Sequence, residues 1–96
     1  MRLCIKQLDL GSAGFKHSVQ KLSPPIRAQL QEALKDLLKD PQPGRLKLEK
    51  LKGYRNPFIY TIHFTGNNSH KLSFELKGDV AIMRRVGTHK QIDRCP

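Results

Sequence analysis

The feature that most constrains this chain is a single apolar stripe in residues 24–39. Apolar side chains recur there at intervals of three and four residues, the spacing of one helix face. The stripe is formed by Ile26, Leu30, Ala33, Leu34, Leu37 and Leu38. The intervening positions are polar and are expected to face solvent: Arg27, Gln31, Glu32, Lys35, Asp36 and Lys39. The pattern therefore predicts an amphipathic helix with one buried side.

The sequence also predicts where this helix begins and ends. Ser23 is suited to accept a bond from a free backbone N–H, and Pro24 loses nothing at the first helical position. The run Asp40-Pro41-Gln42-Pro43-Gly44 ends the helix, because proline cannot continue it. A shorter helix over Phe15–Leu22 is predicted from its apolar spacing, after Gly11, Ser12 and Gly14 act as breakers.

Elsewhere the apolar period is two, which is typical of strands. A first strand is predicted over Arg2–Leu8, and three more follow in residues 58–65, 71–76 and 80–86. Residues 66–69 and 77–79 are turn-forming, so the last three strands form an antiparallel meander. The segment 45–52 fits either a short strand or an irregular basic stretch.

This order predicts an α+β fold, in which an N-terminal strand and two helices precede a meander of about three strands. The helices pack on one face of a twisted sheet. We expect Phe74 and Ile82 to point toward them. Since strand side chains alternate, the other face is expected to be basic and half-polar, carrying Lys71, Ser73, Glu75, Met83 and Arg85, joined by His63.

Length and charge narrow the function classes. A chain of 96 residues is expected to form one domain, residues 1–96. Its formal net charge is +10, and residues 41–96 carry eleven of the 18 basic side chains. The positive electrostatic potential that results attracts polyanions. We expect no membrane segment or signal peptide, and a cytoplasmic location that keeps Cys4 and Cys95 reduced. A disulfide between these termini is the alternative.

Several kinds of chemistry are disfavoured. The stretch Gly11–Lys16 lacks the glycine spacing and the Ser or Thr of a phosphate-binding loop. The eight acidic residues are scattered and form no pair for metal ions or glycoside hydrolysis. We therefore expect no cofactor and no metal.

A basic segment suggests nucleic-acid binding. Arg45, Lys47, Lys50, Lys52 and Arg55 lie within eleven residues that contain one acid, Glu49. This density suits a phosphate backbone, although a solvated loop would have the same composition. Tyr54 can stack on a base, whereas Tyr60 is expected in the core.

The stretch Arg84–Lys90 carries the residue types that RNA cleavage requires. A base must remove the ribose 2′ proton, an acid must protonate the leaving oxygen, and cations must stabilise the phosphorane. His89, Arg84, Arg85 and Lys90 include all these types, although a lone histidine is more often structural. Asp93, four residues on, can orient His89 or be a surface acid. His63 and His70 flank a hairpin and can approach the same surface.

These residues resemble the RelE/ParE superfamily of toxin–antitoxin toxins, nearest to its RelE/YoeB/YafQ-like mRNA interferase branch. The resemblance covers nearly the whole chain. It is carried by Leu51-Lys52-Gly53-Tyr54-Arg55, His70-Lys71-Leu72-Ser73-Phe74 and Arg84-Arg85-Val86-Gly87-Thr88-His89. It implies a small ribonuclease that enters the ribosomal A site, cleaves mRNA without metal, inhibits translation and is silenced by a cognate acidic antitoxin.

The resemblance also implies residue roles. His89 falls where relatives keep a catalytic histidine, and Arg85 would stabilise phosphate charge. Lys71 stands where many relatives carry arginine in an HRL-like motif, so the charge is kept without the bidentate fork. The other residues expected to bind RNA are Arg45, Lys47, Lys50, Lys52, Tyr54, Arg55, His63, His70, Arg84 and Lys90.

Two other functions fit the same sequence. A ParE-like toxin would inhibit DNA gyrase by binding protein and would need no proton-transfer residue. A noncatalytic RNA-binding module would need only the basic surface, and its binding would weaken with salt.

Overall fold

The computed structural model describes residues 3–55 and 57–96 and has the predicted α+β architecture. Five strands form one sheet in the order β1-β5-β4-β3-β2. β1 pairs with β5 in parallel and the other neighbours are antiparallel. The strands are β1 (Gln7–Asp9), β2 (Glu49–Lys50), β3 (Ile59–His63), β4 (His70–Lys77) and β5 (Val80–Thr88); the helices are α1 (Ala13–Gln20), α2 (Pro24–Leu37), the 3-10 turn η1 (Gly44–Leu46) and α3 (His89–Arg94).

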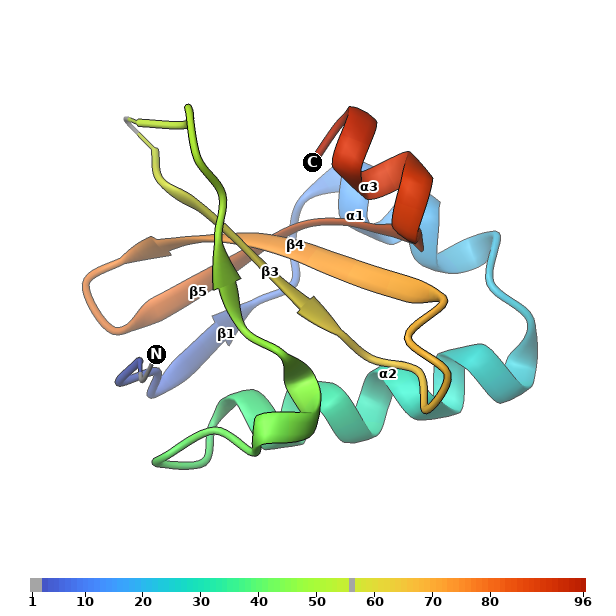
Figure 1. Ribbon diagram of the computed structural model, residues 1–96, viewed down its shortest axis with the longest axis horizontal. Coiled ribbons are helices and arrows are strands. Elements are labelled where there is room, and N and C mark those ends of the chain that lie inside the picture. Colours follow the sequence, from blue (N-terminus) through green and yellow to red (C-terminus); the bar gives the residue numbers. More distant parts are fainter. Residues whose placement is uncertain (1–2, 56) are drawn as a thin grey trace.

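The main core lies between the sheet and the helices α1 and α2. Figure 1 shows α2 running along one side of the sheet, and α3 on the opposite side of the view. Successive side chains of β3, β4 and β5 point to opposite faces of the sheet, so one face of each strand contributes to this core. Its buried apolar residues include Phe15, Leu30, Leu37, Ile62, Leu72, Phe74 and Met83. No described helix has the length and apolar character needed to span a bilayer.

The N-terminal elements start and end elsewhere than predicted. The first strand is Gln7–Asp9 rather than Arg2–Leu8, and Arg2 lies outside the described residues. These three residues pair in parallel with Val80–Ile82 at the start of β5. Leu3 is bonded instead to the Gln42 side chain, through its N–H at 3.0 Å and its carbonyl at 2.6 Å. A side chain thus replaces a strand neighbour.

The first helix begins earlier than predicted, at Ala13. Ser12, taken from sequence as a breaker, is its N-cap: the Ser12 hydroxyl accepts from the Phe15 N–H at 3.0 Å. The prediction that α2 begins at Pro24 is confirmed, but the Ser23 side chain makes no capping bond. Near the end of α2, Asp36 is buried and Leu38 is 44% exposed, the reverse of the prediction.

The predicted register of β5 is wrong in its first half. A β-bulge places Ser73 opposite Arg85 and Phe74 opposite Met83, so that β5 carries one extra residue, Arg84. One extra residue reverses which side chains face the core. Met83 and Ala81 are therefore buried with Phe74, while Ile82 lies outside the core cluster.

The sheet face opposite α1 and α2 is less open than predicted. Cross-strand pairs place Thr61 beside Ser73 and His63 beside Lys71 on this face. Thr61, Lys71 and Ser73 are all buried. The helix α3, which the sequence did not predict, packs against β4 and β5 here. The segment left open in the sequence forms η1 and the short strand β2, and beyond it the chain projects from the sheet as an arm between β2 and β3 (Figure 1).

Candidate active site

Strands β3 and β4 and helix α3 bring four chemically active side chains to one cavity. His63 ends β3, its cross-strand partner Lys71 follows the start of β4, and α3 carries His89 and Asp93. The cavity has a volume of about 430 Å³, and its other lining residues are Glu49, Leu51, Lys52 and Tyr54. Residues far apart in the sequence thus meet at the end of the sheet where α3 begins.

Asp93 connects two of these groups. Its Oδ1 accepts from the Lys71 ammonium at 2.7 Å, and its Oδ2 lies 2.7 Å from Nδ1 of His89. The Lys71 hydrogen bond outweighs the opposing effect of burial, and the charges of Lys71 and His89 add to it, so the pKa of Asp93 lies below its usual value. An ionised carboxylate only accepts hydrogen bonds. Nδ1 of His89 therefore carries its proton, and Nε2 is the nitrogen left for chemistry.

His63 lies beside His89, with ring centroids 5.3 Å apart. Burial lowers the pKa of His63, and the nearby charges of Lys71, His89 and Lys47 lower it further. Its Nδ1 is buried without a hydrogen-bond partner, which leaves Nε2 as the ring nitrogen available to the cavity. A neutral imidazole of this kind is suited to accept a proton.

Gly87 and Thr88 have structural roles at the start of α3, directly before His89. Thr88 caps α3: its hydroxyl accepts from the Gln91 N–H at 3.3 Å, and the Gln91 side chain accepts from the Thr88 N–H at 2.9 Å. A Cβ on residue 87 would lie 2.7 Å from Oε1 of Gln91. Glycine thus leaves room for the capping side chain that starts α3 at His89.

Three residues of the predicted basic segment lie on the projecting arm. Lys52 and Tyr54 line the cavity, and Arg55 lies in a neighbouring hollow with Lys50. Phe58 is 45% exposed, and the Lys50 ammonium lies 3.8 Å from the centroid of its ring. Lys47, in a left-handed backbone conformation with φ of 48°, is exposed near His63.

Other predicted site residues lie elsewhere. Arg85, His70 and Lys90 line a different groove, on the α1 side of α3. His70 cannot share the cavity with Lys71, because consecutive strand residues point to opposite faces. Instead its Nδ1 lies 2.7 Å from the Ser69 hydroxyl.

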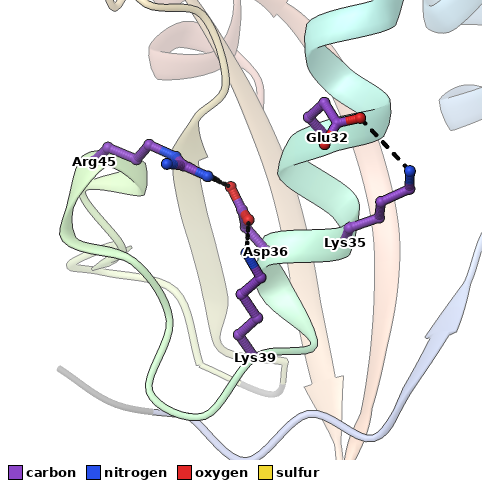
Figure 2. A network of polar contacts seen from close by, with 5 residues as sticks. All are labelled: Glu32, Lys35, Asp36, Lys39 and Arg45. Carbon is purple, nitrogen blue, oxygen red and sulfur yellow. Dashed lines mark hydrogen bonds and ion pairs between the residues drawn. The ribbon is translucent and has the colours of Figure 1, made fainter.

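Two predicted RNA-binding arginines are held in ion pairs. Arg84 donates to Glu75 at 2.6 Å. Arg45 donates to the buried carboxylate of Asp36, which Lys39 also contacts at 2.9 Å (Figure 2). Burial opposes ionisation of Asp36, but these two cations together outweigh it and lower its pKa. Arg45 therefore anchors η1 to α2.

Metal binding and disulfide formation find no support among the described residues. Within residues 3–55 and 57–96, no three His, Cys, Asp or Glu side chains are grouped to hold a metal ion. Cys4 and Cys95 are both free and exposed. Of the two acidic residues that line the cavity, Asp93 and Glu49, the sequence did not suggest Glu49 as a site residue. The only sequence feature that could have indicated it was its position among the lysines of residues 47–52.

Comparison with known structures identifies the fold. The chain is similar to a chain of the RelB–RelE antitoxin–toxin complex from Methanococcus jannaschii, with a TM-score of 0.65 and 25% identity over 94% of this chain and 99% of that one. It is also similar to a copper-bound mutant toxin from Helicobacter pylori, with a TM-score of 0.61 and 19% identity over 92% and 99%. No family model and no curated protein matches the sequence.

The protein thus has the RelE-like toxin fold, as the sequence predicted. Its similarity to the RelE toxin supports a more particular description, the toxin component of a toxin–antitoxin system.

Proposed function

We propose that the protein is an mRNA interferase: an endoribonuclease toxin that cleaves mRNA in the ribosomal A site without a metal ion. The observation that carries this proposal is the Lys71–Asp93–His89 chain of contacts beside His63. It places two imidazoles, with different surroundings, around one cavity. Similarity to the RelE toxin fold supports the same class of activity.

The two histidines have complementary roles in this mechanism. His63, neutral because its pKa is lowered, removes the proton from the ribose 2′ hydroxyl. The 2′ oxygen attacks the adjacent phosphorus, and the bond to the 5′ oxygen of the next nucleotide breaks. His89, held by Asp93 through Nδ1, reacts as the imidazolium: it gives that oxygen the proton on Nε2 and is left neutral, with its remaining proton on Nδ1. The products are a 2′,3′-cyclic phosphate and a 5′ hydroxyl.

Lys71 acts through Asp93 rather than on the substrate. It is 4% exposed, and its ammonium is bonded to Asp93, so we assign it to positioning. Lys52 lines the cavity and is exposed, so it supplies an ammonium for phosphate charge. Arg85 is exposed in the neighbouring groove and does not line the cavity, so we assign it to RNA binding rather than to charge at the reacting phosphate.

The arm, together with Lys47 and the β2 residue Lys50 that precede it, supplies the remaining RNA contacts. Lys47, Lys50, Lys52 and Arg55 are exposed cations, and Tyr54 is 39% exposed beside the cavity, where it can stack on an unpaired base. Arg45 and Arg84 have their charges compensated by Asp36 and Glu75, and we expect them to contribute less.

The partner that silences this activity is an acidic antitoxin. The net charge of +10 favours a negatively charged partner, and the similar archaeal structure is itself an antitoxin–toxin complex. A toxin that acts on ribosomes and is controlled in this way would work in the cytoplasm.

The test is cleavage on programmed ribosomes carrying a defined mRNA, with the new RNA ends mapped. The wild-type protein and His89→Ala are compared with His17→Ala, which removes an exposed histidine from α1. We expect wild-type and His17→Ala to cleave and His89→Ala to be inactive. Cleavage that persists in a folded His89→Ala protein would overturn the assignment. No cleavage by folded wild-type protein would overturn the proposal and turn attention to gyrase supercoiling.

A further inference from the structure

A second, larger hollow lies on the other side of α3. This groove, with a volume of about 600 Å³, runs between α1 and the end of β5. Its basic lining residues are Lys21, His70, Arg85, Lys90 and Arg94, and none of its lining residues is Asp or Glu. By contrast, the cavity around His89 contains Glu49 and Asp93. The groove is therefore the more uniformly basic of the two.

The charges in this groove are uncompensated within the described residues. Lys21, Arg85, Lys90 and Arg94 form no ion pair with any described carboxylate, unlike Arg45 and Arg84. Four unpaired cations that line one hollow give it a positive potential, which attracts anions. Such an arrangement indicates an anionic ligand.

The side-chain oxygen acceptors of the groove already accept hydrogen bonds within the protein. The Ser18 hydroxyl donates to the Phe15 carbonyl and accepts from the Val86 N–H at 3.1 Å. The Gln91 side chain is used by the α3 cap. What remains for a ligand is positive charge, the amide N–H donors of Gln91 and the apolar side chains of Leu22, Val86 and Ile92. This surface suits a repeating charged backbone rather than a particular base sequence.

The groove adjoins the candidate active site. Thr88 and Lys90 line the groove, while His89 between them lines the cavity. A strand that crosses the start of α3 thus passes from one hollow to the other. Because the two hollows are continuous, we favour the RNA strand that is cleaved, rather than an acidic peptide, as the ligand of the groove.

We propose that the groove binds the phosphodiester backbone of the RNA strand whose scissile phosphate lies at His89. The inference rests on the proposed function and deepens it. It assigns Lys21 and Arg94 as backbone-binding residues, and it places Arg85, Lys90 and His70 in this groove rather than around the reacting phosphate. The expected recognition is independent of sequence and sensitive to salt.

The protein contains its own reporter pair for this proposal. Cys95 lines the groove, whereas Cys4 lies outside it, and both are free and exposed. The probe is a 2′-O-methyl RNA of about 12 nucleotides, within the range that single-strand-binding folds cover; it has no 2′ hydroxyl and cannot be cleaved. We expect it to slow alkylation of Cys95 several-fold and to leave Cys4 unchanged, while a trinucleotide protects neither.

A charge variant tests the same point by binding. For Lys21→Gln with Arg94→Gln, the slope of log affinity against log salt should fall by about 1.4, which is 0.7 for each lost phosphate contact. The matched control is Lys6→Gln with Lys77→Gln, which removes two exposed charges outside the groove. We expect the control to keep most of the wild-type slope.

The outcomes separate this proposal from the one on which it rests. If Cys95 is not protected, or if both double variants lose affinity equally, the groove assignment is wrong even when His89-dependent cleavage is intact. If a polyglutamate peptide protects Cys95 and RNA does not, the groove binds acidic protein and the proposal is overturned. Absence of cleavage by the wild-type protein, with Cys95 still protected by RNA, overturns the proposed function alone.

Discussion

Lys71 in β4 and Asp93 in α3, 22 residues apart, form an ion pair of 2.7 Å in which the two ends differ in burial. The Lys71 side chain is 5% exposed and that of Asp93 is 44% exposed. The pair ties α3 to the sheet and directs the second oxygen of Asp93 to His89.

This asymmetry predicts unequal effects of removing the two partners. Asp93→Asn leaves the buried ammonium without its counter-ion, and because the pair is partly screened by solvent we expect a loss of about 1–2 kcal/mol of unfolding free energy. Lys71→Met removes the buried charge and leaves a carboxylate that water can solvate, at a cost below about 1 kcal/mol. Urea unfolding measures both. Equal losses would contradict the asymmetry.

Cleavage kinetics distinguish positioning by Lys71 from a purely structural role. In Lys71→Met the protein remains folded but Asp93 is no longer fixed, so His89 loses its orientation. We expect kcat to fall more than KM rises, and the pH dependence of kcat to change. A rise in KM with an unchanged kcat would instead show that Lys71 contacts RNA.

His63 should titrate below its ordinary pKa of 6.5, because burial and the neighbouring cations disfavour its charged form. The unfolded chain therefore takes up a proton before the folded protein does, and stability is lost as the pH falls from 6.5 toward the lowered value. His63→Gln should remove this loss. Histidine resonances followed by NMR give the pKa directly, and a midpoint at or above 6.5 would contradict the prediction.

The same variant tests proton transfer. Glutamine keeps the approximate size of the side chain but cannot act as a base, so His63→Gln should lower the cleavage rate by about 10²–10⁴-fold. His17→Gln is the matched control, because His17 is exposed on α1 and lines neither the cavity nor the groove. Equal losses in both variants would argue against His63 as the base.

Local patterns in the sequence predicted the elements that depend on periodicity alone. The start of α2 at Pro24, the antiparallel meander and the placement of Tyr60 in the core are confirmed. The alternative in which Asp93 orients His89 also agrees with the observed contact, since residues four apart share a helix face.

Features that depend on distant contacts were not predictable. The bulge at Arg84 changes the facing of Met83 and Ile82 without altering the apolar pattern. Asp36 looks like an exposed helix residue until the chain returns and places Arg45 beside it. Arg85 and His89 are close in sequence, but Arg85 in β5 lines the groove, whereas His89, the first residue of α3, lines the cavity.

The cap of α3 predicts a role for Gly87 and Thr88 that is separate from chemistry. Thr88→Ala removes the acceptor for the Gln91 N–H and should cost about 1 kcal/mol. Gly87→Ala should have a similar effect, because its Cβ displaces the Gln91 amide. Hydrogen exchange should show faster opening of residues 89–94 in both variants. Unchanged exchange in Gly87→Ala would mean that Gln91 adjusts without losing the cap.

The polar network on α2 offers a prediction with an internal control (Figure 2). Asp36 is buried and holds Arg45 and Lys39, so Asp36→Asn should lower the unfolding free energy by about 1–3 kcal/mol at neutral pH. Since the folded pKa lies below 3.8, the difference from wild type should be constant above that value and shrink as the pH falls through the lowered pKa. Glu32→Gln breaks the neighbouring pair with Lys35, whose side chains are both 73% exposed, and should barely change the urea midpoint. If the two variants unfold alike at neutral pH, the buried carboxylate does not anchor η1.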